Sequence, residues 1–388
     1  MAIPLSYNLR NLVARKTTTV MTALGIALTV AVLLASMALV DGLRTSLEAS
    51  GHPLQIIVMR KGGTAELNSI ILRPQFQDLK VKPGIAKSKN GEPLASLEVV
   101  TVIILESPEN PAGININLRG LLPVGFEMRP QARLVEGRMF ETGKREVVVG
   151  AGLAKRYPMA RLGGKLRFGR GEWVIVGVVD GGNTSVSSEV FADLNQLASD
   201  QDRSDGLSSV LIRATDAAAV QPLIDDLEND RRLNVTAMTE KSYYINQTSA
   251  SAPIQFLGVA ISVIMAVGSC FAAMNTMYAA VSRRSSEIGT LRVLGFSRLG
   301  ILASFFLESV MLSLIGGLLG VILVLPLNGA SAGLGNFVTF SENTFQLNVS
   351  PQIMVTGVLF ALFMGAAGGL FPAASAARKQ ILTALREV

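Results

Sequence analysis

Four long stretches with almost no charge constrain this 388-residue chain more than any other feature. They run from Thr17 to Val40, within Pro253–Val281, within Leu299–Leu327, where Glu308 is the one charge, and within Ile353–Phe371. A helix of about 20 residues crosses the hydrocarbon core of a bilayer, which is roughly 30 Å thick. Mean hydropathy is +0.42 and only 16% of the residues are charged. The sequence therefore predicts four transmembrane helices, although its length alone would suggest two or three soluble domains.

The first stretch is interpreted as a retained signal-anchor helix. It is longer than the apolar region of a cleaved signal peptide, and no small-x-small exit precedes Asp41. Sixteen residues that include Arg10, Arg15 and Lys16 come before it.

The charges around the four stretches predict the orientation of the chain. Residues 42–253 contain 25 lysines and arginines and 24 acids, so this segment is almost neutral. The other ten bases all flank the same side of the four spans, and they are Arg10, Arg15, Lys16, Arg283, Arg284, Arg292, Arg298, Arg378, Lys379 and Arg386. By the positive-inside rule this side is cytoplasmic. The basic excess is thus a topology signal, and no nucleic-acid surface is expected.

The expected fold class is an α-helical membrane protein of four transmembrane helices, with a large α+β extracytoplasmic domain inserted between helices 1 and 2. The expected segments are a cytoplasmic interfacial N-terminal helix (1–16), the first span (17–41), the extracytoplasmic domain (42–253), the second span (254–281), a cytoplasmic loop (282–298), the third span (299–327), a short outer loop (328–350), the fourth span (351–372) and a cytoplasmic tail (373–388). The interfacial helix is expected from an apolar stripe of Leu5, Leu9, Leu12 and Val13.

The extracytoplasmic segment shows two strand–helix–strand patterns separated by a β-rich stretch. The first has strands Leu54–Met59 and Leu97–Leu105 with a short helix near Gln75–Leu79; the second has strands Val210–Arg213 and Asn234–Met238 around a helix Ala217–Glu228 with Asp216 as N-cap; the stretch between them has strands Glu146–Val149, Lys165–Phe168 and Trp173–Val179. We expect a split α+β domain with an inserted β subdomain.

Several kinds of chemistry are excluded by the residues that the chain lacks. Cys270 is the only cysteine and His52 the only histidine, so disulfide frameworks, Cys/His zinc sites and Cys–His or Ser–His catalytic pairs are not expected. Gly143-Lys144 and Gly164-Lys165 lack the upstream glycine and the hydroxyl residue of a phosphate-binding P-loop. The outer carboxylates are interpreted as a solvated surface. We expect no catalytic, cofactor or metal site on this chain.

The loop between the second and third spans carries the most specific motif. It reads Arg283-Arg284-Ser285-Ser286-Glu287-Ile288-Gly289-Thr290-Leu291-Arg292-Val293-Leu294-Gly295, and Glu308-Ser309 follows inside the third span. This loop resembles the E-I-G-x-L-R-x-x-G signature of the FtsX-like, MacB-type ABC transporter permeases. Further matches are Leu9-Arg10-Asn11-Leu12, Leu24-Gly25-Ile26-Ala27, Glu136-Gly137-Arg138-Met139-Phe140, Glu146-Val147-Val148-Val149-Gly150, Val176-Gly177-Val178-Val179, Phe371-Pro372-Ala373-Ala374 and Ala384-Leu385-Arg386. The chain departs from the family at Gln380-Ile381, where proline often stands.

The resemblance implies that the loop is a coupling helix that docks on an ABC ATPase subunit. A helix over Ser286–Leu294 would place its apolar residues on one face, with Gly295 as its stop and Ser297 as the N-cap of the next helix. The residues expected to contact the ATPase are Arg284, Glu287, Ile288, Leu291, Arg292 and Leu294. Arg284 is expected at the rim of that contact. The alternative is a membrane-surface helix whose arginines only set the topology.

Two features inside the spans carry separate expectations. Glu308 is an intramembrane ionisable group, for which proton relay or substrate contact is one role. The favoured role is structural, as a carboxyl bonded to a neighbouring helix or to an arginine of the loop. Gly316-x-x-x-Gly320 and Gly365-x-x-x-Gly369 predict close helix approach, either within one subunit or between subunits.

The function implied by the resemblance is that of a permease subunit in the cell inner membrane. ATP and Mg²⁺ would bind a separate ABC ATPase, and the chain would form a homodimer or pair with a second permease among membrane lipids. A periplasmic adaptor and an outer-membrane channel are further implied partners. The alternatives are an FtsX-like regulator of a cell-wall hydrolase or signalling complex, and a lipoprotein-releasing permease. A membrane enzyme is a third alternative, for which catalytic residues are lacking.

Overall fold

The computed structural model describes residues 16–107, 110–248, 252–336 and 341–378. The chain divides into two compact units. The first, here called the membrane unit, comprises Met1–Val40, Pro253–Ala330 and Leu347–Val388, and the second, the α+β unit, comprises Asp41–Ala252 and Ser331–Gln346. Of the predicted interfacial helix over 1–16, only Lys16 is among the described residues. Of the predicted tail over 373–388, only residues 373–378 are described.

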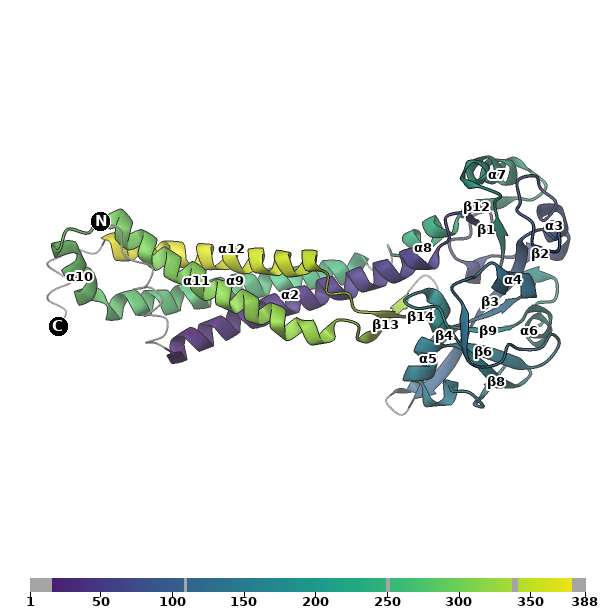
Figure 1. Cartoon of the computed structure of the whole chain (residues 1–388), viewed down its shortest axis with the longest axis horizontal. Helices are drawn as coiled ribbons and strands as arrows, with labels where there is room; N and C mark the ends of the chain where they lie inside the picture. Colours follow the sequence, from purple (N-terminus) through teal and green to yellow (C-terminus); the bar gives the residue numbers. More distant parts are fainter. Residues whose placement is uncertain (1–15, 108–109, 249–251, 337–340, 379–388) are drawn as a thin grey trace. The chain divides into compact units, whose positions relative to one another are not determined.

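Four helices among the described residues are long and apolar enough to cross a membrane, which confirms the predicted spans. They are α2 (Lys16–Ser50), α9 (Ala252–Arg283), α11 (Arg298–Val324) and α12 (Pro351–Arg378), and they run lengthwise in Figure 1. The short helix α10 (Ser285–Val293) connects α9 to α11, and η5 (Leu325–Leu327) follows α11. Helix α2 continues past the expected end of the first span at residue 41, so one unbroken helix leads into the α+β unit.

Small residues allow the membrane helices to approach one another closely. A Cβ added at Gly320 of α11 would lie 2.8 Å from the carbonyl oxygen of Ala27 in α2. A Cβ at Gly365 of α12 would lie 2.0 Å from Oγ of Ser313 in α11, and the Gly365 carbonyl accepts a hydrogen bond from Ser309 Oγ at 2.8 Å. The glycine pairs of α11 and α12 therefore serve packing within this chain.

The α+β unit contains short strands, single-turn helices and a few longer helices. Its strands are β1 (Gln55–Arg60), β2 (Ile71–Leu72), β3 (Ala95–Ser107), β4 (Asn110–Leu121), β5 (Arg133–Gly137), β6 (Glu146–Gly150), β7 (Lys165–Phe168), β8 (Gly171–Asp180), β9 (Glu189–Asp193), β10 (Gly206–Leu207), β11 (Ser209–Arg213), β12 (Val235–Thr239), β13 (Ser331–Asn336) and β14 (Ser341–Gln346). Its helices are η1 (Glu66–Asn68), α3 (Arg73–Leu79), α4 (Pro123–Glu127), α5 (Ala151–Arg156), η2 (Pro158–Ala160), η3 (Ser185–Ser188), α6 (Leu194–Asp200), α7 (Ala217–Asn229) and α8 (Glu240–Thr248).

Ten of the described strands form one mixed sheet. Its order is β12-β1-β11-β3-β4-β9-β6-β8-β5, with β7 paired to β8. The strands predicted at both ends of the domain and in the β-rich stretch are present, and Asp216 caps α7 by accepting a hydrogen bond from Ala219 N at 2.9 Å. The β-rich stretch is not a separate layer, because β9 pairs in parallel with β4 and so extends the same sheet. Strands β4, β5 and β9 were not predicted.

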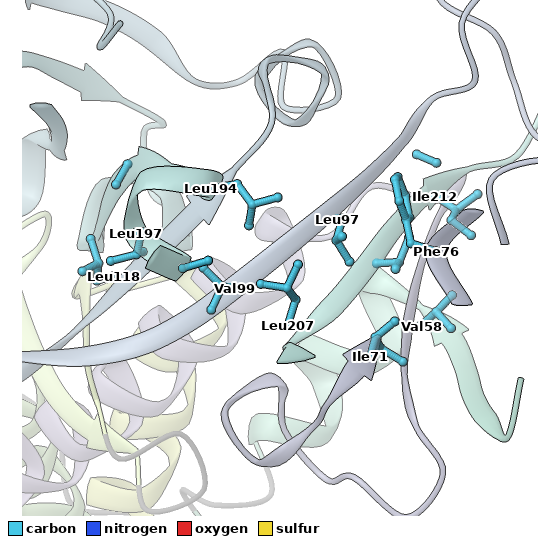
Figure 2. Close-up of a cluster of buried hydrophobic side chains, with 14 of the residues drawn as sticks. Val58, Ile71, Phe76, Leu97, Val99, Leu118, Leu194, Leu197, Leu207 and Ile212 are labelled. Carbon is cyan, nitrogen blue, oxygen red and sulfur yellow. The ribbon is translucent and has the colours of Figure 1, made fainter. Parts of the chain in front are cut away.

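The two faces of this sheet differ in chemistry, as the two-residue period of a strand allows. Val147 and Val149 of β6 point into the large apolar core, whereas Val148 between them packs in a smaller cluster with Phe191. Helices α3, α5, α6 and α7 contribute to the large core, part of which Figure 2 shows with Phe76 of α3 and Leu194 and Leu197 of α6.

The outer loop between α11 and α12 holds a hairpin. Strands β13 and β14 pair in antiparallel fashion and belong to the α+β unit. Glu342 of β14 forms an ion pair with Arg156 of α5. This ion pair holds the hairpin to helix α5, which lies much earlier in the sequence.

Candidate functional site

The α9–α11 loop folds as its sequence predicts. Helix α10 covers Ser285–Val293 and stops at Gly295, whose φ of +91° is a conformation that side chains with a Cβ rarely adopt. Ser297 caps α11, because its Oγ accepts a hydrogen bond from Gly300 N at 3.1 Å. Arg292 Nη1 donates to the Phe296 carbonyl at 3.2 Å and so ties the end of α10 to the turn that follows. The loop is thus a helix with defined ends, and its faces are fixed.

Arg284, the residue that precedes α10, is buried against α11 and does not lie at an exposed rim, which corrects the expectation from the sequence. Its residue surface is only 4% exposed. Its Nη1 is 3.0 Å from Glu308 Oε2, its Nε is 3.0 Å from Glu287 Oε2, and its guanidinium carbon lies 4.9 Å from the centre of the Phe305 ring. A buried arginine in this setting holds α10 to α11 by charge, hydrogen bonds and stacking.

Ile288 is also turned inward. It is 1% exposed and belongs to an apolar cluster with Met277, Val281, Ile301, Phe305, Ala373 and Ala376, which come from α9, α11 and α12. The expected ridge of Ile288, Leu291 and Leu294 as a free docking face is therefore wrong for Ile288, and Leu291 is only partly exposed. The chain uses this side of α10 for its own packing.

The apolar side chains that remain exposed lie at the end of α10 and the start of α11. Val293 is 64% exposed, Leu294 65% and Leu299 75%. These three residues are here called the exposed tip. The Glu287 side chain is also 55% exposed, although one of its oxygens contacts Arg284. The tip is therefore an apolar surface that follows a helix held to the rest of the chain by Arg284 and Ile288.

Glu308 is the acidic partner that keeps the buried arginine neutralised. It is 5% exposed on α11 and accepts a hydrogen bond from Arg284 Nη1 at 3.0 Å. This is the arrangement expected for a carboxyl that holds the loop end of the bundle together. An ion pair of this kind compensates two charges that would each be costly to bury alone.

A second group of charges, in the α+β unit, was missed from the sequence. Arg119 of β4 is 3% exposed and bonds to three carboxylates, Glu66 at 2.8 Å, Glu98 at 2.7 Å and Glu189 at 2.8 Å. Arg129 bonds to Glu98 at 2.7 Å. Four outer carboxylates, Glu66, Glu98, Glu189 and Glu240, are at most 4% exposed, which contradicts their interpretation as a solvated surface. The signal was Glu98, a charge inside the predicted strand Leu97–Leu105.

In this network the arginine–glutamate contacts of Arg119 and Glu66 outweigh the effect of burial on their pKa values. Burial lowers and the three glutamates raise the pKa of Arg119, which ends well above its usual value. Burial alone would raise the pKa of Glu66, but Arg119 and the Ser209 hydroxyl bring it below its usual value. Burial raises the pKa of Glu240 to about 7, although the nearby charge of Arg129 and the hydrogen bond from His52 N both lower it. Arginine and carboxylate are thus matched, and Glu240 is the exception.

No cluster of three or more His, Cys, Asp or Glu side chains that could hold a metal ion exists among the described residues. The cavity bordered by Arg119, Glu189, Tyr243 and Tyr244 has a volume of about 10 Å³, which is room for about one water molecule. These observations concern only the part of the chain that the structure describes.

Comparison with known proteins gives two family matches. Residues 19–230 match the family described as MacB-like periplasmic core domain, and residues 259–381 match the FtsX-like permease C-terminal family. Both agree with the resemblance found in the loop motif.

Individual relatives are similar over different parts of the chain. The macrolide export ATP-binding/permease protein MacB of Bdellovibrio bacteriovorus is 25% identical over 98% of this chain and 61% of its own length. The uncharacterized ABC transporter permease YknZ of Bacillus subtilis is 31% identical over 51% of this chain and 49% of its own length. The MacB protein of Hahella chejuensis is 27% identical over 58% of this chain. This chain spans 35% to 61% of the length of these relatives.

Among solved structures, the periplasmic region of MacB from Actinobacillus actinomycetemcomitans matches 52% of this chain with a TM-score of 0.38 and 15% identity. The extracellular domain of the noncanonic ABC-type transporter YknZ from Gram-positive bacteria matches 48% with a TM-score of 0.36 and 17% identity.

Proposed function

Because the chain belongs to the family of permeases with a MacB-like periplasmic core domain and an FtsX-like C-terminal domain, we propose that it transmits ATP-driven movement across a membrane. A separate ABC ATPase binds ATP and Mg²⁺ and hydrolyses the nucleotide. The chain itself is not catalytic. It converts the closing and opening of the ATPase into movement of the α+β unit, which handles substrate on the outer side of the inner membrane.

The exposed tip is the observation that carries this proposal. Three large apolar side chains at the end of α10 and the start of α11 are exposed, while Arg284 and Ile288 of the same loop are buried against α9, α11 and α12. Apolar surface of this kind gains free energy when a partner groove covers it. Because the buried arginine is fixed to Glu308 of α11, a push on the tip moves α11 as well.

The loop and both termini are placed on the cytoplasmic side in this proposal. The support is the charge distribution, in which ten bases flank one side of the four spans. A homodimer or a paired permease, a periplasmic adaptor and an outer-membrane channel complete the proposed assembly, with extrusion of substrate as its task. The names of the MacB relatives support export as the process.

Association of the tip with the ATPase is tested by an acidic substitution. Leu294→Asp places an unpaired carboxylate in the proposed contact and should weaken association on the order of 100-fold. Leu294 is a cleaner target than Leu291, because Leu291 is partly packed against the chain itself. Leu134→Asp, at a leucine that is 43% exposed in the α+β unit, is the matched control.

The measurement is the yield of ATPase that co-purifies with the full chain in detergent. Loss with Leu294→Asp and normal yield with Leu134→Asp support the proposal. Normal yield with both variants shows that the tip is not the docking surface.

A further inference from the structure

A short, mostly buried segment between β8 and β9 connects parts of the chain that are far apart in sequence. This segment, Gly181–Ser188, is here called the junction segment, and its last four residues form η3, all of them buried. Two internal hydrogen bonds hold its shape: Thr184 Oγ1 donates to the Gly181 carbonyl at 2.9 Å, and Ser187 Oγ donates to the Gly182 carbonyl at 2.8 Å. It is therefore a folded turn with little freedom of its own.

The first contact of the junction segment is with the end of α2. Ser185 N donates a hydrogen bond to Oγ of Ser50 at 2.7 Å, and Ser50 is the last residue of α2 and 2% exposed. Helix α2 runs from Lys16 to Ser50, so the first membrane span and Ser50 belong to the same helix.

The second contact is with α8, the helix that precedes α9 in the chain. Ser185 Oγ donates to the Tyr244 hydroxyl at 3.1 Å, and Tyr244 is 7% exposed. His52 N donates to Glu240 Oε2 at 2.8 Å, which joins the residues after α2 to the start of α8. The end of α2 and the helix α8 that precedes α9 therefore both contact Ser185.

The third contact is with the hairpin that links α11 to α12. Gln346 N, at the end of β14, donates to Oδ1 of Asn183 at 3.0 Å. All four membrane helices therefore continue in sequence into an element that touches the junction segment: α2 itself, α8 before α9, and the β13–β14 hairpin between α11 and α12.

On its other side the junction segment leads straight into the middle of the sheet. Strand β9 begins at Glu189, is buried at every residue and lies between β4 and β6. Glu189 holds Arg119 of β4 with two hydrogen bonds of 2.8 and 3.2 Å. A Cβ at Gly150, the last residue of β6, would lie 2.4 Å from the Ser187 carbonyl carbon, so the backbones of the segment and of β6 pack closely against each other.

We propose that the junction segment is the point at which movement of the membrane helices enters the sheet of the α+β unit. Ser185 receives it from α2 and α8, Asn183 receives it from the hairpin, and Glu189 passes it to β4 through Arg119. These residues position the outer unit and do not touch substrate. The inference rests on the proposed function, since it requires that a partner ATPase drives the membrane helices.

Hydrogen–deuterium exchange of the full chain with its ATPase in lipid nanodiscs tests the inference, with and without ATP trapped by vanadate. In the wild type, ATP should change the exchange of residues 41–50 and of residues 181–188. Tyr244→Phe removes the hydroxyl that accepts a hydrogen bond from Ser185 Oγ. Ser50→Ala removes the hydroxyl that accepts a hydrogen bond from the Ser185 backbone amide. In each variant the ATP-induced change in exchange of residues 181–188 should fall by a factor of about five, because one ordinary hydrogen bond changes an equilibrium constant by about this factor. The ATP-induced change in exchange of residues 41–50 should stay as in the wild type.

Tyr243→Phe is the matched control. Tyr243 is the neighbouring tyrosine of α8, is 3% exposed and accepts its hydrogen bond from Glu66 N at 3.3 Å, away from the junction segment. Tyr243→Phe should leave the ATP-induced changes in exchange of residues 41–50 and 181–188 as large as in the wild type. Asn183→Ala, at a partly exposed position, gives a further test if the buried variants unfold, and it should also reduce the change at 181–188.

Three outcomes overturn the inference. A wild-type change at 181–188 in the Ser50→Ala/Tyr244→Phe double variant excludes the segment as the point of entry. A wild type in which ATP changes 41–50 but not 181–188 refutes this inference and leaves the proposed function standing. A wild type in which ATP changes neither segment refutes the proposed function, and this inference with it.

Discussion

Glu240 is a carboxyl whose folded surroundings disfavour its charge. It is 2% exposed, and burial raises its pKa to about 7, whereas a free glutamate titrates near 4.5. The folded state therefore binds this proton more tightly than the unfolded state does. The stabilisation is fully present below about pH 4.5 and is lost as pH rises towards 7, which is the opposite of the usual behaviour of a carboxylate in an ion pair.

Glu240→Gln should remove that pH dependence. The amide keeps an acceptor for the His52 nitrogen but carries no charge, so above pH 7 the variant should be more stable than the wild type by on the order of 2 kcal/mol. Below pH 4.5 the difference should vanish. Trp173 is the chain's only tryptophan and is fully buried in the α+β unit, so its fluorescence during urea unfolding of the full chain reports this unit. A difference in unfolding free energy between Glu240→Gln and the wild type that does not change with pH would contradict the raised pKa of Glu240.

Arg284 and Arg283 are neighbours with opposite environments. Arg284→Ala removes the guanidinium that pairs with the buried Glu308 carboxylate, and should lower the stability of the chain by about 3 kcal/mol. Arg283→Ala removes an exposed charge and should cost well under 1 kcal/mol. Thermal unfolding in detergent, followed by the loss of monodisperse protein, compares the two. Equal midpoints for both variants would show that the Arg284–Glu308 pair does not hold the loop.

At the scale of helices, close packing of α12 on α11 depends on glycine. Gly365→Ala would place a methyl group 2.0 Å from Ser313 Oγ and 2.5 Å from its Cβ, so the helices must separate. We expect a loss of about 1–3 kcal/mol in the stability of the membrane unit. Gly268→Ala in α9 meets open space and should be neutral or stabilising. The same thermal assay checks both, and equal loss in the two variants would argue against this packing.

Elements with a strong hydrophobic period could be predicted, and elements whose charges are paired at a distance could not. The four spans and helix α7 follow from apolar runs and a cap at Asp216. Strand β4 was missed because Arg119 and Asn117 interrupt its apolar pattern, and only the glutamates of η1, β3 and β9 make that arginine acceptable in a buried strand. Tertiary partners, invisible in a single sequence, decided this case.

The candidate site shows the same limit. The motif predicted helix α10, its stop at Gly295 and the cap at Ser297. It did not predict which apolar face the chain would keep for itself, because Ile288 and Leu294 are equally apolar and only the positions of α9, α11 and α12 distinguish them.

At the scale of the whole molecule, the proposal requires that the α9–α11 loop and the α+β unit lie on opposite sides of the membrane. In a Cys270→Ala background, Lys89→Cys in the exposed part of the α+β unit should react with an impermeant thiol reagent added to spheroplasts. Thr290→Cys, exposed on α10, should react only after the membrane is opened. Labelling of both positions in closed spheroplasts would contradict the topology derived from the charges.

In the proposed function, a partner ATPase hydrolyses ATP and acts on this chain through the exposed tip. The most direct measurement is the ATP hydrolysis rate in lipid nanodiscs of the ATPase alone, the chain alone, and the complexes formed with wild type, Leu134→Asp and Leu294→Asp. We expect no hydrolysis by the chain alone, stimulation by wild type and Leu134→Asp, and a rate with Leu294→Asp that falls to that of the ATPase alone. Hydrolysis by the purified chain, or wild-type stimulation by Leu294→Asp, would contradict it.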